Sequence, residues 1–198
     1  MDTESAAISA LMERYAAGDD SVFTDLYRLL SPRLYRFCMR LTAMPYEADD
    51  CFQETLLRLH RARATFKEGA NALHWVFAIA RSVYLTKLRY WKRRPETLGR
   101  ATDVSQRSEI HPEATATPET LVIAQHLLVT VAQELKRMSE KNRTAYVLLK
   151  EEGLSARDAA AVLGTSADAV KQRAHRAYEQ LKTALDAAGW NGHELPAR

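Results

Sequence analysis

The sequence predicts an all-α protein in which two helical domains are joined by a flexible linker, the second domain containing a helix-turn-helix. Its 198 residues include only seven glycines and six prolines, and apolar residues recur at spacings of three and four. No stretch alternates apolar and polar residues as a half-buried strand does. A polar, proline-containing stretch separates two blocks of helical pattern. Hydrophobic residues make up 46% of the chain and charged residues 27%, so each domain can bury a core.

The boundaries of the domains follow from the same pattern. The predicted parts are a first domain over residues 1–94, a linker over 95–120, a second domain over 121–188 and a tail over 189–198. The linker is polar, is punctuated by Pro95, Pro112 and Pro118, and contains few large apolar residues. The first domain is therefore expected to be tethered to the second.

The distribution of charge is more informative than its sum, which is only +3. The first 25 residues are rich in acid, the segment from Leu73 to Arg94 contains basic but no acidic residues, and Pro95 to Glu119 is acidic again. A mixed surface of this kind suits a protein that contacts both DNA and another protein.

The N-terminal residues have neither the basic start nor the apolar run of a signal peptide, and no apolar run approaches the roughly 20 residues that a bilayer requires. We therefore expect a cytoplasmic protein without membrane insertion. Cys38 and Cys51 both lie in helical patterns, which favours two reduced thiols. A metal site that combines them with His60 or His74 would match no zinc spacing, so we expect neither a metal nor a cofactor.

The first domain opens with two amphipathic segments. The stripe of the first is Phe23, Leu26, Tyr27, Leu30, Leu34, Phe37 and Leu41. Pro32 is expected to bend this helix or to begin a new turn. Pro45 opens the next helix, whose inward stripe is predicted as Ala48, Phe52, Leu56 and Leu59. Its other side carries Asp49, Asp50, Gln53, Glu54, Leu57 and Arg61.

Leu57 is a large apolar residue in the middle of that polar face. Single exposed leucines are common, so it has two interpretations. It is either an ordinary surface residue or the apolar centre of a contact with a partner protein, surrounded by a polar rim.

A long basic helix follows the connection KEGANA. Its core stripe is Leu73, Val76, Phe77, Ala80, Val83, Tyr84, Leu88 and Trp91. Its outer side carries His74, Trp75, Arg81, Arg89, Lys92 and Arg93. A charge run is often only a solvated face. Because no acidic residue neutralises this one and an aromatic residue lies beside it, phosphate contact combined with base stacking is the alternative that we favour.

The segment from Ser155 to Lys182 predicts the helix-turn-helix. Ser155 can cap a short first helix, Gly164 permits a tight turn, and Ser166 can cap the second helix. The predicted inward stripe of the second helix is Val170, Ala174, Ala177, Tyr178, Leu181 and Leu185. The expected DNA-binding residues are Ser166, Asp168, Lys171, Gln172, Arg173, His175 and Arg176. They lie in the first turns, which enter a major groove. A helix pair that only packs a bundle is the alternative.

Three segments in order resemble the extracytoplasmic-function (ECF) group of sigma factors over nearly the whole chain. EADDCFQETLLRL is similar to the polymerase-docking signature, with Asp50, Gln53 and Glu54 in the matching places. HWVFAIARSVYLTKLRYWKRR resembles the minus-ten helix, matching at Trp75, Ile79, Ala80 and Arg81. AVKQRAHRAYEQL resembles the minus-thirty-five helix, matching at Val170, Lys171, Arg173 and Arg176. Ala169, Gln172 and Ser82 depart from the residues common in the family, at positions on which base preference depends.

The resemblance implies core RNA polymerase and promoter DNA as partners, an anti-sigma inhibitor as a further candidate, and transcription initiation as the function. It also implies that the connection from Thr65 to Ala72 catches a flipped base. The main alternative is a conventional helix-turn-helix regulator with an effector or dimerisation domain. An enzyme that holds magnesium through Glu47, Asp49, Asp50 and Glu54 is disfavoured, because such sites usually draw carboxylates from two helices. We therefore expect no catalytic residues.

Overall fold

The computed structural model describes residues 3–42, 44–93 and 118–190, and within them omits the side chains of Lys92 and residues 118–125. These residues form helices without strands, which confirms the all-α prediction. The first domain contains α1 (Thr3–Ala16), α2 (Phe23–Thr42), α3 (Pro45–Ala62) and α4 (Ala72–Arg93), with short 3₁₀ turns at Asp20–Val22 and Arg63–Thr65. The second contains α5 (Pro118–Arg137), α6 (Glu140–Tyr146), a π-helical turn (Val147–Glu151), α7 (Ala156–Leu163) and α8 (Ala167–Ala187).

Most of the predicted linker and tail lies outside the described residues. The last three residues of the predicted linker, 118–120, instead form the start of α5. Proline is favoured in the first turn of a helix, where its missing N–H has no partner to lose, so Pro118 begins the helix. Among the helices that the structure describes, none combines the length and the apolar composition of a membrane-spanning segment.

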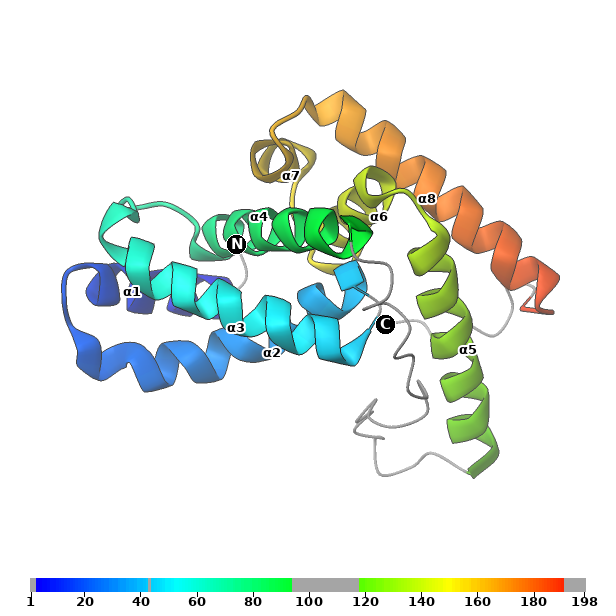
Figure 1. Cartoon of the computed structure of the whole chain (residues 1–198), viewed down its shortest axis with the longest axis horizontal. Helices are drawn as coiled ribbons and strands as arrows, with labels where there is room; N and C mark the ends of the chain where they lie inside the picture. The colour runs from blue at the N-terminus through cyan, green and yellow to red at the C-terminus, as the bar shows by residue number, and fades with distance from the viewer. Residues whose placement is uncertain (1–2, 43, 94–117, 191–198) are drawn as a thin grey trace.

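The core of the first domain forms where α2, α3 and α4 pack together with α1 (Figure 1). Phe37 of α2 and Phe77 of α4 lie at its centre, with ring centroids 4.6 Å apart, and neither is exposed. The α2 helix continues through Pro32, so that residue does not begin a separate helix. The predicted α4 stripe is buried from Leu73 to Tyr84.

The buried faces differ from the predicted stripes at several residues. On α3, Cys51 and Thr55 are buried, whereas Phe52 and Leu56 are only half-buried. Because α3 packs against both α2 and α4, its buried arc is centred between the two neighbours instead of on the largest side chains. Phe23, Tyr27 and Tyr178, which were predicted to face the core, are 36%, 42% and 48% exposed.

The helix-turn-helix has the predicted construction. The hydroxyl of Ser155 accepts a hydrogen bond from the Asp158 N–H, and the hydroxyl of Ser166 accepts one from the Ala169 N–H, at 3.1 and 3.2 Å. Gly164 ends α7 in the left-handed region at φ 61°, which a residue with a Cβ adopts only at a cost of roughly 1 kcal/mol. These caps place the start of α8 directly after the turn.

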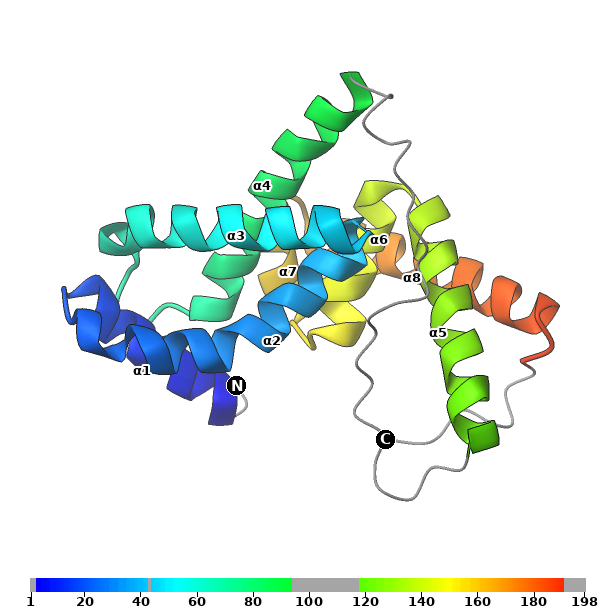
Figure 2. The ribbon, with the colours of Figure 1, turned by 60° about the horizontal axis from the view of Figure 1, so that its bottom comes forward.

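The two domains are packed against each other, and this was not predicted. A single cluster of buried apolar residues continues from the first domain through α6 and α7 to the start of α8. The α7 helix lies beside α4, and α5 and α6 contact α2 (Figures 1 and 2). The sequence predicted a core for each domain, whereas the described residues form a continuous core across the domain boundary.

Candidate nucleic-acid and protein interfaces

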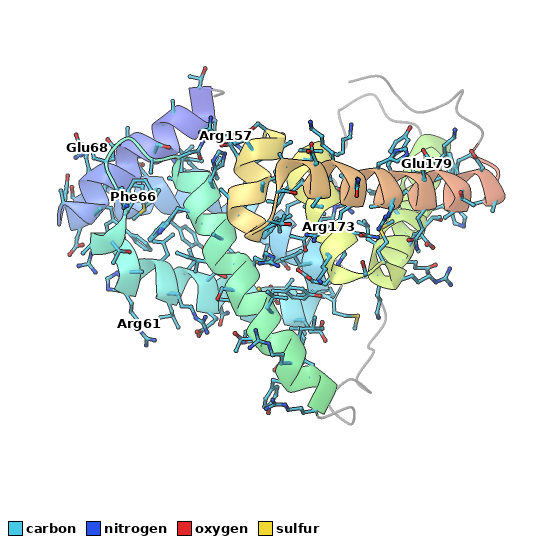
Figure 3. The ribbon with its side chains drawn as sticks, turned by 90° about the horizontal axis from the view of Figure 1, so that it is seen from above. Arg61, Phe66, Glu68, Arg157, Arg173 and Glu179 are labelled. Carbon is cyan, nitrogen blue, oxygen red and sulfur yellow. The ribbon has the colours of Figure 1, made fainter. Side chains whose placement is uncertain are left out.

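The outer face of α8 is available for contact. Lys171, Gln172, His175 and Arg176 are all exposed, and Asp168 makes only a surface ion pair with Lys171 at 3.7 Å. The opposite face of the helix is fixed to its domain by Val170, Ala174, Ala177 and Leu181, which are buried. The structure therefore brings the predicted outer residues together on one cationic surface. Arg173, labelled in Figure 3, is half-buried, and Ser166 serves as the helix cap.

The predicted face of α4 is divided into two parts. Near its start, His74 Nδ1 lies 3.7 Å from Asp158 Oδ1 of α7, and Arg81 Nε lies 3.4 Å from Glu140 Oε1 of α6. Toward its end, Arg89 and Arg93 are exposed, and this end of the helix projects away from the other helices in Figure 2. The predicted contact through the Lys92 side chain falls outside what the structure describes.

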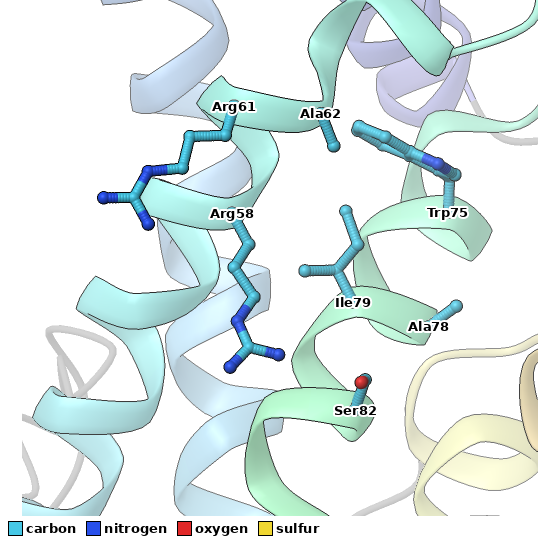
Figure 4. Close-up of a pocket in the computed structure, with 7 residues that line it drawn as sticks. All are labelled: Arg58, Arg61, Ala62, Trp75, Ala78, Ile79 and Ser82. Carbon is cyan, nitrogen blue, oxygen red and sulfur yellow. The ribbon is translucent and has the colours of Figure 1, made fainter. Parts of the chain in front are cut away.

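A cavity of about 540 Å³ opens between α3 and α4 beside Trp75 (Figure 4). Its lining residues are Arg58, Arg61, Ala62, Trp75, Ala78, Ile79 and Ser82. Trp75 packs edge to face on Phe66, with the ring centroids 5.4 Å apart, and this contact fixes the position of its indole. The cavity thus combines an aromatic wall and an apolar floor, and two arginine side chains of α3 border it.

Sequence reasoning identified Trp75 but did not predict this cavity. Phe66 comes from the connection that was expected to catch a base, yet it is buried, and the cavity is lined by the neighbouring helices. Arg58 was not predicted, and Arg61 belongs to this cavity as well as to the outer face of α3. Nothing local in the sequence indicates the grouping, because the residues come from two different helices.

The outer face of α3 places Leu57 in the surroundings that the sequence predicted. Leu57 is 50% exposed and lies beside Gln53, which is also exposed. The carboxylates around it have partners within the domain. Asp50 pairs with Lys87 of α4, Glu54 accepts a hydrogen bond from Arg58 at 2.8 Å, and Asp49 accepts one from Tyr35.

Leu57 also lies on the rim of a second cavity, of about 610 Å³, between α1, α2 and α3. The other apolar wall of this cavity is formed by Tyr15, Phe23 and Leu56, a grouping that the sequence did not predict. The Tyr15 hydroxyl and His60 Nδ1 are 2.5 Å apart, and burial raises the pKa of Tyr15, so its hydroxyl remains protonated. The exposed part of α3 therefore offers an apolar depression, not only a single leucine.

The carboxylates of α3 do not form a metal site. In the described part of the chain, no group of three or more His, Cys, Asp or Glu side chains is placed to hold a metal ion. Cys38 and Cys51 are buried together in the first domain. The pKa of the Cys38 thiol is raised, first by its hydrogen bond to Cys51 and then by burial, so that Cys38 remains a neutral thiol.

Comparison with known proteins agrees with this arrangement. The family Sigma-70 region 2 matches residues 26–94, and the family Sigma-70, region 4 matches residues 128–181. The RNA polymerase sigma factor CarQ of Myxococcus xanthus is 30% identical over 176 residues, which cover 88% of this chain and 95% of CarQ. The chain belongs to the sigma-70 family. The ECF RNA polymerase sigma factor SigW of Bacillus subtilis is 25% identical, over 90% of this chain and 96% of SigW.

Solved structures extend the likeness of this ECF sigma factor across both of its domains. The sigma factor RpoE of Bartonella quintana, in complex with the anti-sigma factor NepR, superposes with a TM-score of 0.64 at 27% identity, covering 83% of this chain and 96% of RpoE. CnrH, in complex with the cytosolic domain of CnrY, gives 0.65 at 26% identity, covering 91% of this chain and 98% of CnrH. The sigma factor reading is confirmed, and the conventional regulator is not favoured.

Proposed function

We propose that this sigma factor docks on core RNA polymerase through the exposed face of α3, contacts the minus-ten strand through α4, and contacts the minus-thirty-five duplex through α8. It acts by positioning the polymerase on DNA, in the cytoplasm where both partners are found, and contributes no catalytic residue of its own. The proposal rests on the cationic face of α8. This face is exposed to solvent and begins directly after a capped turn.

The cavity beside Trp75 would take an unstacked base of the minus-ten strand. An aromatic wall can stack on any base, and Arg58 and Arg61 at the same cavity can contact the phosphates on either side of that base. Arg89 and Arg93 at the projecting end of α4 would continue the phosphate contacts along the strand.

An anti-sigma factor is a further partner that the likeness to RpoE supports, because that structure holds the anti-sigma factor NepR. Such an inhibitor could use the apolar depression beside Leu57 and thereby compete with the polymerase.

The docking proposal is tested by replacing Leu57 with arginine. Leu57 is half-exposed, so Leu57→Arg should leave the fold unchanged and lower the affinity for core polymerase at least about tenfold, the effect expected of a residue central to an interface. Binding of fluorescently labelled protein to purified core enzyme measures the loss. Ala10→Arg introduces the same group at an exposed position of α1 and should bind as the parent does. Equal affinity of the two folded variants would remove Leu57 from the docking surface.

A further inference from the structure

The connection between α3 and α4, residues 66–71, is held by α1, a helix far from it in the sequence. Three side chains of α1, spaced four residues apart on one face, make the contacts: Ser5, Ser9 and Glu13. The Gly69 N–H donates a hydrogen bond to Glu13 Oε1 at 2.8 Å, and the Ala72 N–H donates one to the Ser9 hydroxyl at 3.1 Å. The side-chain amide of Asn71 donates a third to the Ser5 hydroxyl at 3.3 Å.

The contacts at the start of α4 satisfy backbone groups that a helix by itself leaves without partners. The first four N–H groups of a helix have none within it. Ala72 is the first residue of α4, and the Ser9 hydroxyl accepts its N–H. The side-chain oxygen of Asn71 accepts the His74 N–H at 3.3 Å. Ser9 is only 7% exposed, so water has little access to this contact, and the start of α4 is fixed relative to α1.

The end of α3 is held by the same helix. The Tyr15 hydroxyl of α1 lies 2.5 Å from Nδ1 of His60, near the end of α3. The guanidinium of Arg63, in the 3₁₀ turn that follows, lies 5.3 Å from the centroid of the Tyr15 ring. Helix α1 therefore bridges the end of α3 and the start of α4.

These contacts bear on the cavity beside Trp75, which lies between the same two helices (Figure 4). Trp75 is in the first turn of α4, and its N–H donates to the Asn71 carbonyl at 3.2 Å. Its indole packs on Phe66, which belongs to the connection. Arg58 and Ala62 of α3 line the other side. The separation of the two sides of the cavity therefore depends on the segment that α1 holds.

We propose that Ser9 and Glu13 of α1 are positioning residues for this cavity, because they hold Trp75 at the separation from α3 that an unstacked base fits. Stacking needs close contact between two flat faces, and a gap of about 0.5–1 Å already forfeits a quarter to a half of a dispersion contact. This inference rests on the proposed function for the ligand of the cavity, whereas the positioning of Trp75 itself does not depend on it.

The position of Trp75 is tested first, in the free full-length protein. The chain contains three tryptophans, so Trp91→Phe with Trp190→Phe leaves the fluorescence of Trp75 alone. In that background, Ser9→Ala and Glu13→Ala each remove one hydrogen-bond acceptor for the connection. Both should shift the emission of Trp75 to longer wavelength and increase its quenching by acrylamide. Glu13→Gln keeps an acceptor oxygen and should restore the parent spectrum. Unchanged emission in both alanine variants, each folded by circular dichroism, would overturn the positioning role.

The consequence for DNA is measured on the complex with core polymerase, using two labelled single strands of twelve nucleotides, one of mixed sequence and one abasic. Both carry the same phosphates, so the ratio of their affinities isolates the contribution of the bases. Trp75→Ala should lower this ratio about tenfold, as expected when one base loses its stacking partner. Ser9→Ala with Glu13→Ala should lower it about threefold, because about half of that contact is lost. Binding of the abasic strand should not change.

A matched control separates positioning from charge. Glu4→Ala removes an exposed carboxylate from the same helix and should leave the affinity ratio as it is in the parent. A ratio that falls in Trp75→Ala but not in the double variant of Ser9 and Glu13 would overturn the inference about α1. A ratio that Trp75→Ala leaves unchanged would instead contradict the proposed function of the cavity, while the fluorescence of Trp75 still decides the positioning role.

Discussion

The two helices assigned to DNA have similar amphipathic sequences but differ in how much of their outer face is free. The first turns of α8 present Lys171, His175 and Arg176 to solvent. The first half of α4 presents His74 and Arg81 to carboxylates of another domain. A basic helical face in a sequence therefore indicates what can be bound, whereas the neighbouring helices decide how much of that face is free.

The surroundings of the two faces also differ in how strongly charges interact. Lys171 and Asp168 form an exposed pair on one helix, with side chains 64% and 89% exposed, and such pairs contribute about 0–1 kcal/mol. Arg81 and Glu140 are only 22% and 15% exposed, so water and salt screen their interaction less. The outer face of α8 is therefore exposed to solvent, whereas His74 and Arg81 in the first half of α4 lie against carboxylates of the second domain.

The largest effect on promoter binding should come from mutating the exposed outer face of α8. Arg176→Ala should weaken binding of the polymerase complex to promoter duplex by about 1–3 kcal/mol if Arg176 reads a base, with selectivity relaxed at one position. If it contacts phosphate, the loss should be equal across sequences and the salt dependence should flatten. Filter binding to duplexes that differ at single positions distinguishes the two. Unaltered binding by a folded variant would return α8 to a purely structural role.

A smaller effect on DNA binding is expected for the first half of α4. There, changing the two members of one ion pair, Arg81 and Glu140, should alter the affinity in opposite directions. Glu140→Gln should tighten binding of single-stranded DNA a few-fold because it releases Arg81 from its partner, whereas Arg81→Ala should weaken it because the cation itself is lost. Anisotropy titrations at several salt concentrations measure both. Changes of the same sign in the two variants would show that the pair does not compete with DNA.

The smallest effect concerns the proton of His74. Burial lowers the pKa of His74 below its ordinary 6.5, and the carboxylate of Asp158 partly offsets this by raising it. Asp158→Asn should therefore lower the pKa further, as followed by NMR titration of the imidazole with His74→Gln for assignment.

The sign of the pH dependence follows from the same shift. Burial between the two domains disfavours the charged imidazole, so the contribution of His74 to the contact between the domains is fully present above pH 6.5 and is lost as the pH falls toward the lowered pKa. A variant that opens the domains should move the pKa back toward 6.5. A pKa that is unaffected by opening would place His74 outside the interface.

Much of the fold was determined by local chemistry that the sequence displays directly. Ser155, Gly164 and Ser166 define the helix-turn-helix because caps and left-handed turns depend on residues within a few positions. The stripe from Leu73 to Tyr84 is buried because a helix repeats every 3.6 residues whatever it packs against. Leu57 is exposed on a polar face for the same reason.

Which side chains share a site depends on how the helices pack together. Phe23 and Tyr15 line the depression beside Leu57, and Arg58 lines the cavity beside Trp75, because separate helices bring them together. The pairing of Arg33 with Glu152 joins residues 119 positions apart. Periodicity fixes the direction of a side chain relative to its own helix, whereas the identity of its neighbour depends on how the helices pack, which no local pattern encodes.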